Sequence, residues 1–266
     1  MCGPVFYRHG LHKIQINVLF AMNFFKTALI SSLAIASSSI FAQALPDIGG
    51  VKIGALLATQ KPLMEKVNAD YKFSEIKTRE GKVVGIQGIA ENKNNSVNDH
   101  MIALQDDSGK IWFLGRAQKY PEGGYIPKAT FISALKQKYG TPSDITPDEQ
   151  SMLWAYDRNY ALTAHKASIG MCPHGAGGNV TTPRTDLSRL KGDSINLAVP
   201  AGFEPNCGIQ LNAKLNRHYA SDMIVGSAIQ IVDHKVRYDV LEKKSNEEEA
   251  ARKKALDAMK DNKPKL

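Results

Sequence analysis

The chain has few cysteines and no apolar run long enough to cross a membrane. It carries 3 cysteines in 266 residues. A membrane-spanning helix needs about 18 to 20 consecutive apolar residues, whereas serines interrupt the most apolar stretch, Ala28 to Ile40. Motifs of common hydrolases are also missing, because no Gly-x-Ser-x-Gly elbow and no His-Glu-x-x-His segment occurs. The sequence therefore predicts no membrane span, and no motif in it indicates a particular reaction.

Positive charge is slight and is not gathered into a stripe. The formal net charge is +8, and it falls to +5 when Arg8, Lys13 and Lys26 of the first 44 residues are set aside. Lysines and acids are interspersed along the rest of the chain. A nucleic-acid interface needs basic residues clustered on one face, so the composition argues against DNA or RNA as a partner.

The segment from Met22 to Ala44 has the three parts of a secretory signal peptide. A lysine follows the methionine, the apolar stretch comes next, and Ala42-Gln43-Ala44 has the small-x-small pattern of a cleavage site. We expect residues 1–44 to be a signal peptide, with residues 1–21 upstream of the true start. The mature chain then begins at Leu45, which is not a cysteine that could carry a lipid. The predicted location is the periplasm, or the medium if the protein is secreted further.

Two cysteines, Cys172 and Cys207, remain after this processing. Export places them in an oxidising compartment, where a single pair most simply forms one disulfide. The bond would close a loop of about 35 residues, for which chain entropy predicts a stabilisation of roughly 3 to 4 kcal/mol. Glycines and prolines are frequent between the two cysteines, so we expect an irregular loop there.

Hydrophobic periodicity predicts an α+β fold with antiparallel β-sheet, two packed helices and a long charged C-terminal helix. The order of strands and helices along the chain favours antiparallel pairing over a doubly wound sheet. The expected strands are 73–80, 82–90, 100–105, 110–117, 151–156, 207–215 and 223–232, and the expected packed helices contain 63–71 and 131–139. The expected divisions are a globular region, 45–233, which two subdomains (45–120 and 121–233) could make up, and a charged C-terminal helix and tail, 234–266.

Two strands carry expectations about which residues share a face. Alternation places Ile111 and Phe113 on one face of their strand. Trp112 and Leu114 fall on the other face, and because both faces are apolar this strand should be central. In the strand 207–215, apolar residues alternate with glycine or polar residues, so one face should be buried and the other wet.

The C-terminal helix should be solvated over most of its surface. Charged residues of opposite sign recur four residues apart, and each such pair adds about 0.2 to 0.5 kcal/mol to a helix. Its apolar residues form a thin stripe of Ala250, Ala251, Ala255, Leu256 and Met259. The stripe could rest on the sheet or on a partner, and a solvated extension is the alternative.

Two glycine-containing segments resemble parts of the small envelope modules of the BamE/SmpA type. Gly50-Val51-Lys52-Ile53-Gly54 runs into one expected helix, and Leu135-Lys136-Gln137-Lys138-Tyr139-Gly140-Thr141-Pro142 closes another. In that family a Gly-x-x-x-Gly segment opens a helix that ends in a Gly-x-Pro turn, and a short antiparallel sheet packs beside it. The chain departs from the family where Ala55-Leu56 replaces Met-Thr, and it has no lipid-bearing cysteine and no counterpart for the stretch from Gly170 onward. The resemblance implies binding or assembly in the cell envelope, and it implies no catalytic residues.

Four aromatic residues are the candidate lining of a ligand cleft. They are Trp112, Phe113, Trp154 and Tyr156. Concave aromatic surfaces are common in binding sites, and these residues come from the two halves of the globular region. A cleft between the halves is the functional interpretation, and packing in the hydrophobic core is the alternative.

His165 and His174 are the candidate polar site residues. A cysteine nucleophile needs a neighbouring base, and His174 follows Cys172 closely, but a disulfide at Cys172 would leave no thiol to activate. No His-x-His or His-x-x-x-His spacing occurs in the mature chain, so no metal site is predicted. Asp233 before His234 is better explained as a helix N-cap than as a ligand. No cofactor is predicted either.

The leading hypothesis is a soluble exported protein that binds an envelope protein or another cell-envelope component and performs no chemistry. One alternative is a secreted hydrolase with a histidine-centred site. Another is a protein secreted to act on a host or a competitor.

Overall fold

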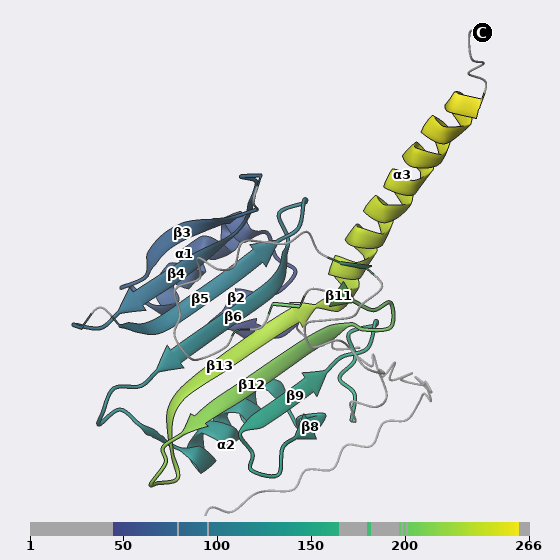
Figure 1. The fold of residues 1–266 in the computed structure, drawn as a ribbon. Helices are drawn as coiled ribbons and strands as arrows, with labels where there is room; N and C mark the ends of the chain where they lie inside the picture. The colour runs from purple at the N-terminus through teal and green to yellow at the C-terminus, as the bar shows by residue number, and fades with distance from the viewer. Residues whose placement is uncertain are drawn as a thin grey trace, which may run out of the picture. The chain divides into compact units, whose positions relative to one another are not determined.

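The computed structural model describes residues 45–78, 80–94, 96–164, 180–181, 197, 199–200 and 202–260. A nine-stranded sheet forms the centre of this part of the chain (Figure 1). In spatial order its strands are β3 (Lys72–Lys77), β4 (Val83–Glu91), β5 (Val97–Gln105), β6 (Ile111–Lys119), β13 (Met223–Asp233), β12 (Ile209–Arg217), β9 (Ser151–Ala155) and β8 (Asp144–Ile145). The short strand β7 (Ile126–Pro127) pairs with the first residues of β13. Neighbouring strands run antiparallel, so the predicted α+β class with antiparallel sheet is confirmed.

Strands from the two halves of the chain meet at the centre of the sheet. β6 pairs with β13 along residues 113–119. β12 also pairs with β13, so β13 lies between a strand of the first half and a strand of the second. The strands β3 to β6 of the first half and the strands β7 to β9, β12 and β13 of the second half are therefore parts of one sheet.

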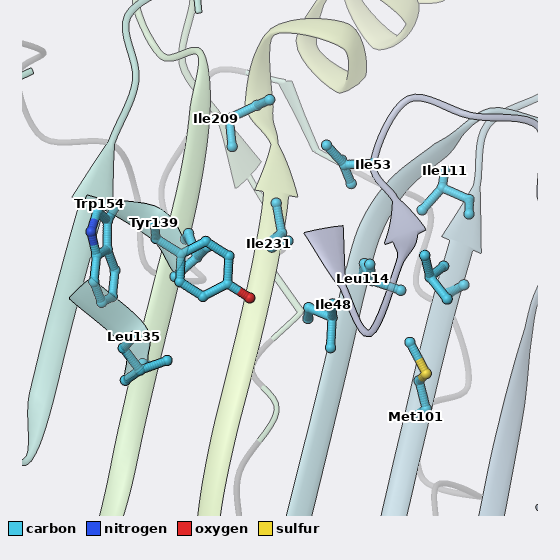
Figure 2. Close-up of a cluster of buried hydrophobic side chains, with 14 of the residues drawn as sticks. Ile48, Ile53, Met101, Ile111, Leu114, Leu135, Tyr139, Trp154, Ile209 and Ile231 are labelled. Carbon is cyan, nitrogen blue, oxygen red and sulfur yellow. The ribbon is translucent and has the colours of Figure 1, made fainter. Parts of the chain in front are cut away.

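Two helices and a small hairpin cover one face of the sheet. They are α1 (Leu57–Val67), α2 (Lys128–Tyr139) and the hairpin of β1 (Asp47–Ile48) with β2 (Val51–Lys52). Their buried side chains join those of the strands in the larger hydrophobic core (Figure 2). Figure 2 shows Leu135 and Tyr139 of α2 beside Trp154 of β9, and the rings of Tyr139 and Trp154 are 5.6 Å apart. Gly140 follows α2 with a φ of +83°, which glycine adopts without strain, so the predicted end of this helix is confirmed.

The opposite face of the sheet is covered by β10 (Val180–Thr181), β11 (Gly202–Phe203) and the first turns of α3 (His234–Lys260). A second, smaller core lies there. Its buried members are Ile76, Ile102, Leu104, Trp112, Phe113, Phe203, Val232, Tyr238 and Leu241. The strand β6 is buried on both faces because both faces of the sheet are covered at this point. It lies at the centre of the strand order, as its apolar residues on both faces predicted.

Helix α3 leaves the sheet after its first two turns. Asp233 caps it, since Oδ1 accepts a hydrogen bond of 3.0 Å from the Val236 amide, which confirms the predicted N-cap. Beyond Leu241, every residue up to Met259 is exposed. Leu256 is 56% exposed, so the predicted apolar stripe does not rest on the sheet. In the described ranges, no helix combines the length and the apolar character that a membrane crossing requires.

A β-bulge changes which residues of β6 share a face. Leu104 lies opposite Phe113 and Gln105 lies opposite Ile111, so Trp112 is an extra residue in the ladder. Trp112 and Phe113 both pack in the second core, whereas Ile111 packs in the first. The expectation that Ile111 shares a face with Phe113 is wrong, because strict alternation holds only for an unbulged strand.

The predicted wet face of β12 is wet only in its second half. Gln210 is buried, and exposure begins further along at Lys214. Gln210 lies opposite Ala155 of β9, which is itself buried. Ala155 forms a third small cluster of buried residues with Leu153 and Cys207.

Replacement of Gly208 by alanine should lower the free energy of unfolding by about 1 to 3 kcal/mol, the usual cost of overpacking. A Cβ atom at this position would lie 1.8 Å from the carbonyl oxygen of Asp157, so the backbone must move. Urea denaturation of the wild type and the variant measures the loss. Gly124→Ala, where the nearest atoms are 3.2 Å away in an exposed turn, is the milder control. Equal losses of unfolding free energy in the two variants would contradict the close approach between Gly208 and the Asp157 carbonyl.

Candidate functional site

The four aromatic residues expected to line one cleft are not brought together. Trp112 and Phe113 belong to the second core, and the ring of Trp112 stands edge to face with that of Phe203 at 5.5 Å. Trp154 and Tyr156 belong to the first core, on the other face of the sheet. Core packing therefore explains Phe113, Trp154 and Tyr156, while Trp112 also borders a cavity described below.

The predicted polar site residues His165 and His174 lie outside the described residues, as does Cys172. Cys207 is buried, with 1% of its surface exposed. Its pairing with Cys172 stays a prediction. Among the described residues, no group of three or more histidine, cysteine or acidic side chains could hold a metal ion.

A pocket of about 360 Å³ lies on the face of the sheet that carries α3. The turns of two neighbouring hairpins, β3–β4 and β5–β6, form two of its sides, and the first turns of α3 form the third. The described lining consists of Thr78, Glu80, Lys82, Val84, Leu104, Gln105, Asp107, Trp112, Arg237, Val240, Leu241 and Lys244. We name it the α3 pocket.

The centre of the α3 pocket is a guanidinium stacked on an indole. The Arg237 guanidinium carbon lies 5.0 Å from the centre of the Trp112 ring, within the range of a cation–π contact. Burial lowers the pKa of Arg237, and the nearby carboxylates of Asp107 and Asp106 act against that shift. Its Nε is buried and has no hydrogen-bond acceptor among the described residues. No described carboxylate lies within ion-pair distance of this guanidinium, so it retains donors for a ligand.

Tight hairpin turns place an ion pair, Lys82 with Asp107, at the rim of the α3 pocket. Asp106 Oδ1 accepts a hydrogen bond of 2.8 Å from the Ser108 amide, and Gly109 has a φ of +81°, so the β5–β6 turn is closed. This turn presents Asp107, which accepts a hydrogen bond of 2.5 Å from the Lys82 ammonium of the next hairpin. That hydrogen bond is the main cause that lowers the pKa of Asp107.

A second guanidinium, Arg116, is half-buried and paired with an acid inside the fold. Its Nε and Nη2 donate to the two carboxylate oxygens of Asp99 at 3.0 and 2.6 Å. Tyr71 donates to the same carboxylate at 2.7 Å, and Asn68 and Gln118 donate as well. Because Asp99 receives five hydrogen bonds, this network satisfies its buried charge. Burial is the largest cause that raises the pKa of Tyr71.

A smaller cavity of about 310 Å³ lies between α2 and the sheet. Its lining is mainly apolar, and its two cations are already paired. Arg116 pairs with Asp99, and Lys138 pairs with Asp47 at 2.8 Å. The α3 pocket is therefore the better candidate, because Arg237 is not committed to a described acid.

Comparison of the chain with family models, with curated proteins and with solved structures finds no match. The resemblance to BamE/SmpA-type modules therefore stays a prediction. In the structure, its two segments flank different helices, since Gly50–Gly54 precedes α1 and Gly140–Pro142 follows α2.

Two buried titratable groups oppose each other in their effect on stability. Burial raises the pKa of Asp233 from 3.8 to about 6, so between pH 4 and 6 the folded protein holds a proton that the unfolded chain lacks. Acidification through this window therefore stabilises the fold through Asp233. Burial lowers the pKa of His100 from 6.5 to about 4, so the unfolded chain takes up the proton first and acidification destabilises the fold.

We expect Asp233→Asn to lose stability more steeply than the wild type when the pH falls from 7 to 4.5. His100→Gln should show the opposite slope, because only the Asp233 effect remains. Each pKa unit corresponds to about 1.4 kcal/mol, and the two opposite effects add, so the two variants should diverge by roughly 4 kcal/mol between pH 7 and 4.5. Urea denaturation at a series of pH values measures these slopes. Parallel curves for the three proteins would show that neither group titrates as described.

Proposed function

We propose that this chain is exported and that it binds a component of the cell envelope without transforming it. The α3 pocket carries the proposal. It holds a half-buried guanidinium on an aromatic ring, and its described lining contains no serine, cysteine or histidine that could act as a nucleophile or as an imidazole base. An arrangement of this kind holds an anionic ligand by charge and by stacking.

Export is supported by the signal-like segment before Leu45 and by the pair of cysteines that follows it. In the periplasm or the medium, Cys172 and Cys207 would form a disulfide. Cys207 lies two residues before the start of β12 and is buried in a cluster with Leu153 and Ala155. A disulfide at this point would tie the segment that begins at Cys172 to the edge of the central strands.

Reduction of the exported protein should lower its free energy of unfolding by about 2 to 4 kcal/mol, the usual worth of one disulfide. The double variant Cys172→Ser, Cys207→Ser should be less stable than the oxidised wild type and should not respond to reductant. Urea denaturation with and without dithiothreitol measures the difference, and mass spectrometry after thiol labelling gives the oxidation state. Two labelled thiols in native protein taken from the periplasm would contradict the pairing.

The binding function is tested by incubating the purified full-length mature chain with an envelope extract and identifying what it retains. We expect the wild type to retain an intact compound, and Arg237→Gln to lose it. Lys243→Gln is the matched control, because Lys243 lies on the same helix, is 79% exposed and does not line the α3 pocket. Denaturation and mass spectrometry of the released molecules give the readout. Accumulation of a chemically altered product, or retention that is equal in the two variants, would contradict the proposal.

A further inference from the structure

We infer that the α3 pocket takes a monocarboxylic acid with a flat apolar body, whose carboxylate binds Arg237 and whose body lies against Trp112. This inference rests on the proposed binding function and adds the chemical class of the ligand. The cavity of about 360 Å³ is large enough for a small organic molecule.

The charge of the α3 pocket favours one negative charge on the ligand. Its described lining carries three cations and two acids, a net charge of one positive. At the rim, Lys82 and Asp107 already satisfy each other at 2.5 Å. Lys244 pairs with Glu248 at 3.9 Å. Arg237 is left as the cation of the described lining with no described acid at ion-pair distance, and a guanidinium matches a carboxylate through two parallel hydrogen bonds. A doubly charged phosphate would bring a second negative charge, for which the described lining leaves no second cation outside an ion pair.

The walls of the α3 pocket favour a flat apolar body. Trp112 reaches into the pocket because the β-bulge places it on the same face as Phe113. Leu104, Val84 and Leu241 complete an apolar surface around the indole. Since the guanidinium already stacks on Trp112, a carboxylate bound to Arg237 holds the attached body beside this apolar surface.

The experiment titrates the full-length mature protein with 2-naphthoate and follows the indole N–H signals by two-dimensional NMR. The chain has 2 tryptophans, so the two signals report two places. Trp112 borders the pocket, and Trp154 donates its indole N–H to Gly140 in the other core. We expect 2-naphthoate to shift the Trp112 signal and to leave that of Trp154 unchanged. The neutral 2-naphthalenemethanol and the doubly charged 2-naphthyl phosphate should bind about tenfold more weakly or worse, because each lacks the matching charge.

Variants distinguish binding of 2-naphthoate in the α3 pocket from nonspecific binding elsewhere on the protein. Arg237→Gln should weaken 2-naphthoate by about tenfold or more, the loss expected for charge-assisted hydrogen bonds, and Arg237→Lys should fall between it and the wild type. Lys243→Gln should bind like the wild type. If Arg237→Gln does not fold, Asp107→Asn still tests the inference. Asp107 is exposed at the rim, and removal of its charge should tighten 2-naphthoate a few-fold, on the order expected for one screened charge.

Equal binding of the acid and the alcohol would overturn the assigned charge. A shift of Trp154 instead of Trp112, or no shift of either signal at millimolar probe, would overturn the assigned site and ligand class. If the probe fails while the wild type still retains an envelope compound that Arg237→Gln loses, the ligand class is wrong and the binding function stands. If both experiments fail, the binding function fails as well.

Discussion

The pairing of β6 with β13 is the contact on which the rest of the structure depends. It joins a strand of the first half of the chain to a strand near its end, and it makes one sheet of both halves. β13 runs directly into α3 through the Asp233 cap, with no loop between them. The register of this pairing therefore determines where the first turns of α3 lie. The same register places β6, which carries Trp112, beside the strand that leads into α3, which carries Arg237. The two side chains therefore meet.

The two half-buried guanidiniums show how the fold treats charge differently at two places. Arg116 is paired with Asp99, whose carboxylate also accepts from neutral donors such as Tyr71, so this cation is compensated inside the protein. Arg237 is compensated by the indole face of Trp112 and by no described acid at ion-pair distance. Arg237 nevertheless lines an open cavity, where an anionic ligand would supply the negative charge that no described acid supplies at ion-pair distance. This contrast with Arg116 is the physical basis of the proposed function.

Local patterns predicted most of the elements, because they depend on neighbours in sequence. Strand alternation found β12 and β13, helical spacing found α2, and Gly140 and Asp233 marked helix boundaries through backbone geometry and capping. The errors at Trp112 and Gln210 have a shared cause. The bulge at Trp112 depends on the register of the neighbouring strand, and the burial of Gln210 depends on its surroundings in the folded sheet, neither of which a local pattern encodes. For the same reason, four aromatic residues that looked like one cleft were divided between two cores.

By itself, the sequence determined the α+β class, the central strand β6 and the solvated length of α3. These depend on periodicity, on apolar composition and on charge along a single segment. Only the tertiary structure decided that Arg237 lies over Trp112 beside a cavity. The two residues are far apart in the chain, and their contact follows from strand register and a β-bulge rather than from any motif. Arg237 gave no signal of its own in the sequence, because one arginine in a charged helix is indistinguishable from its solvated neighbours until the packing is known.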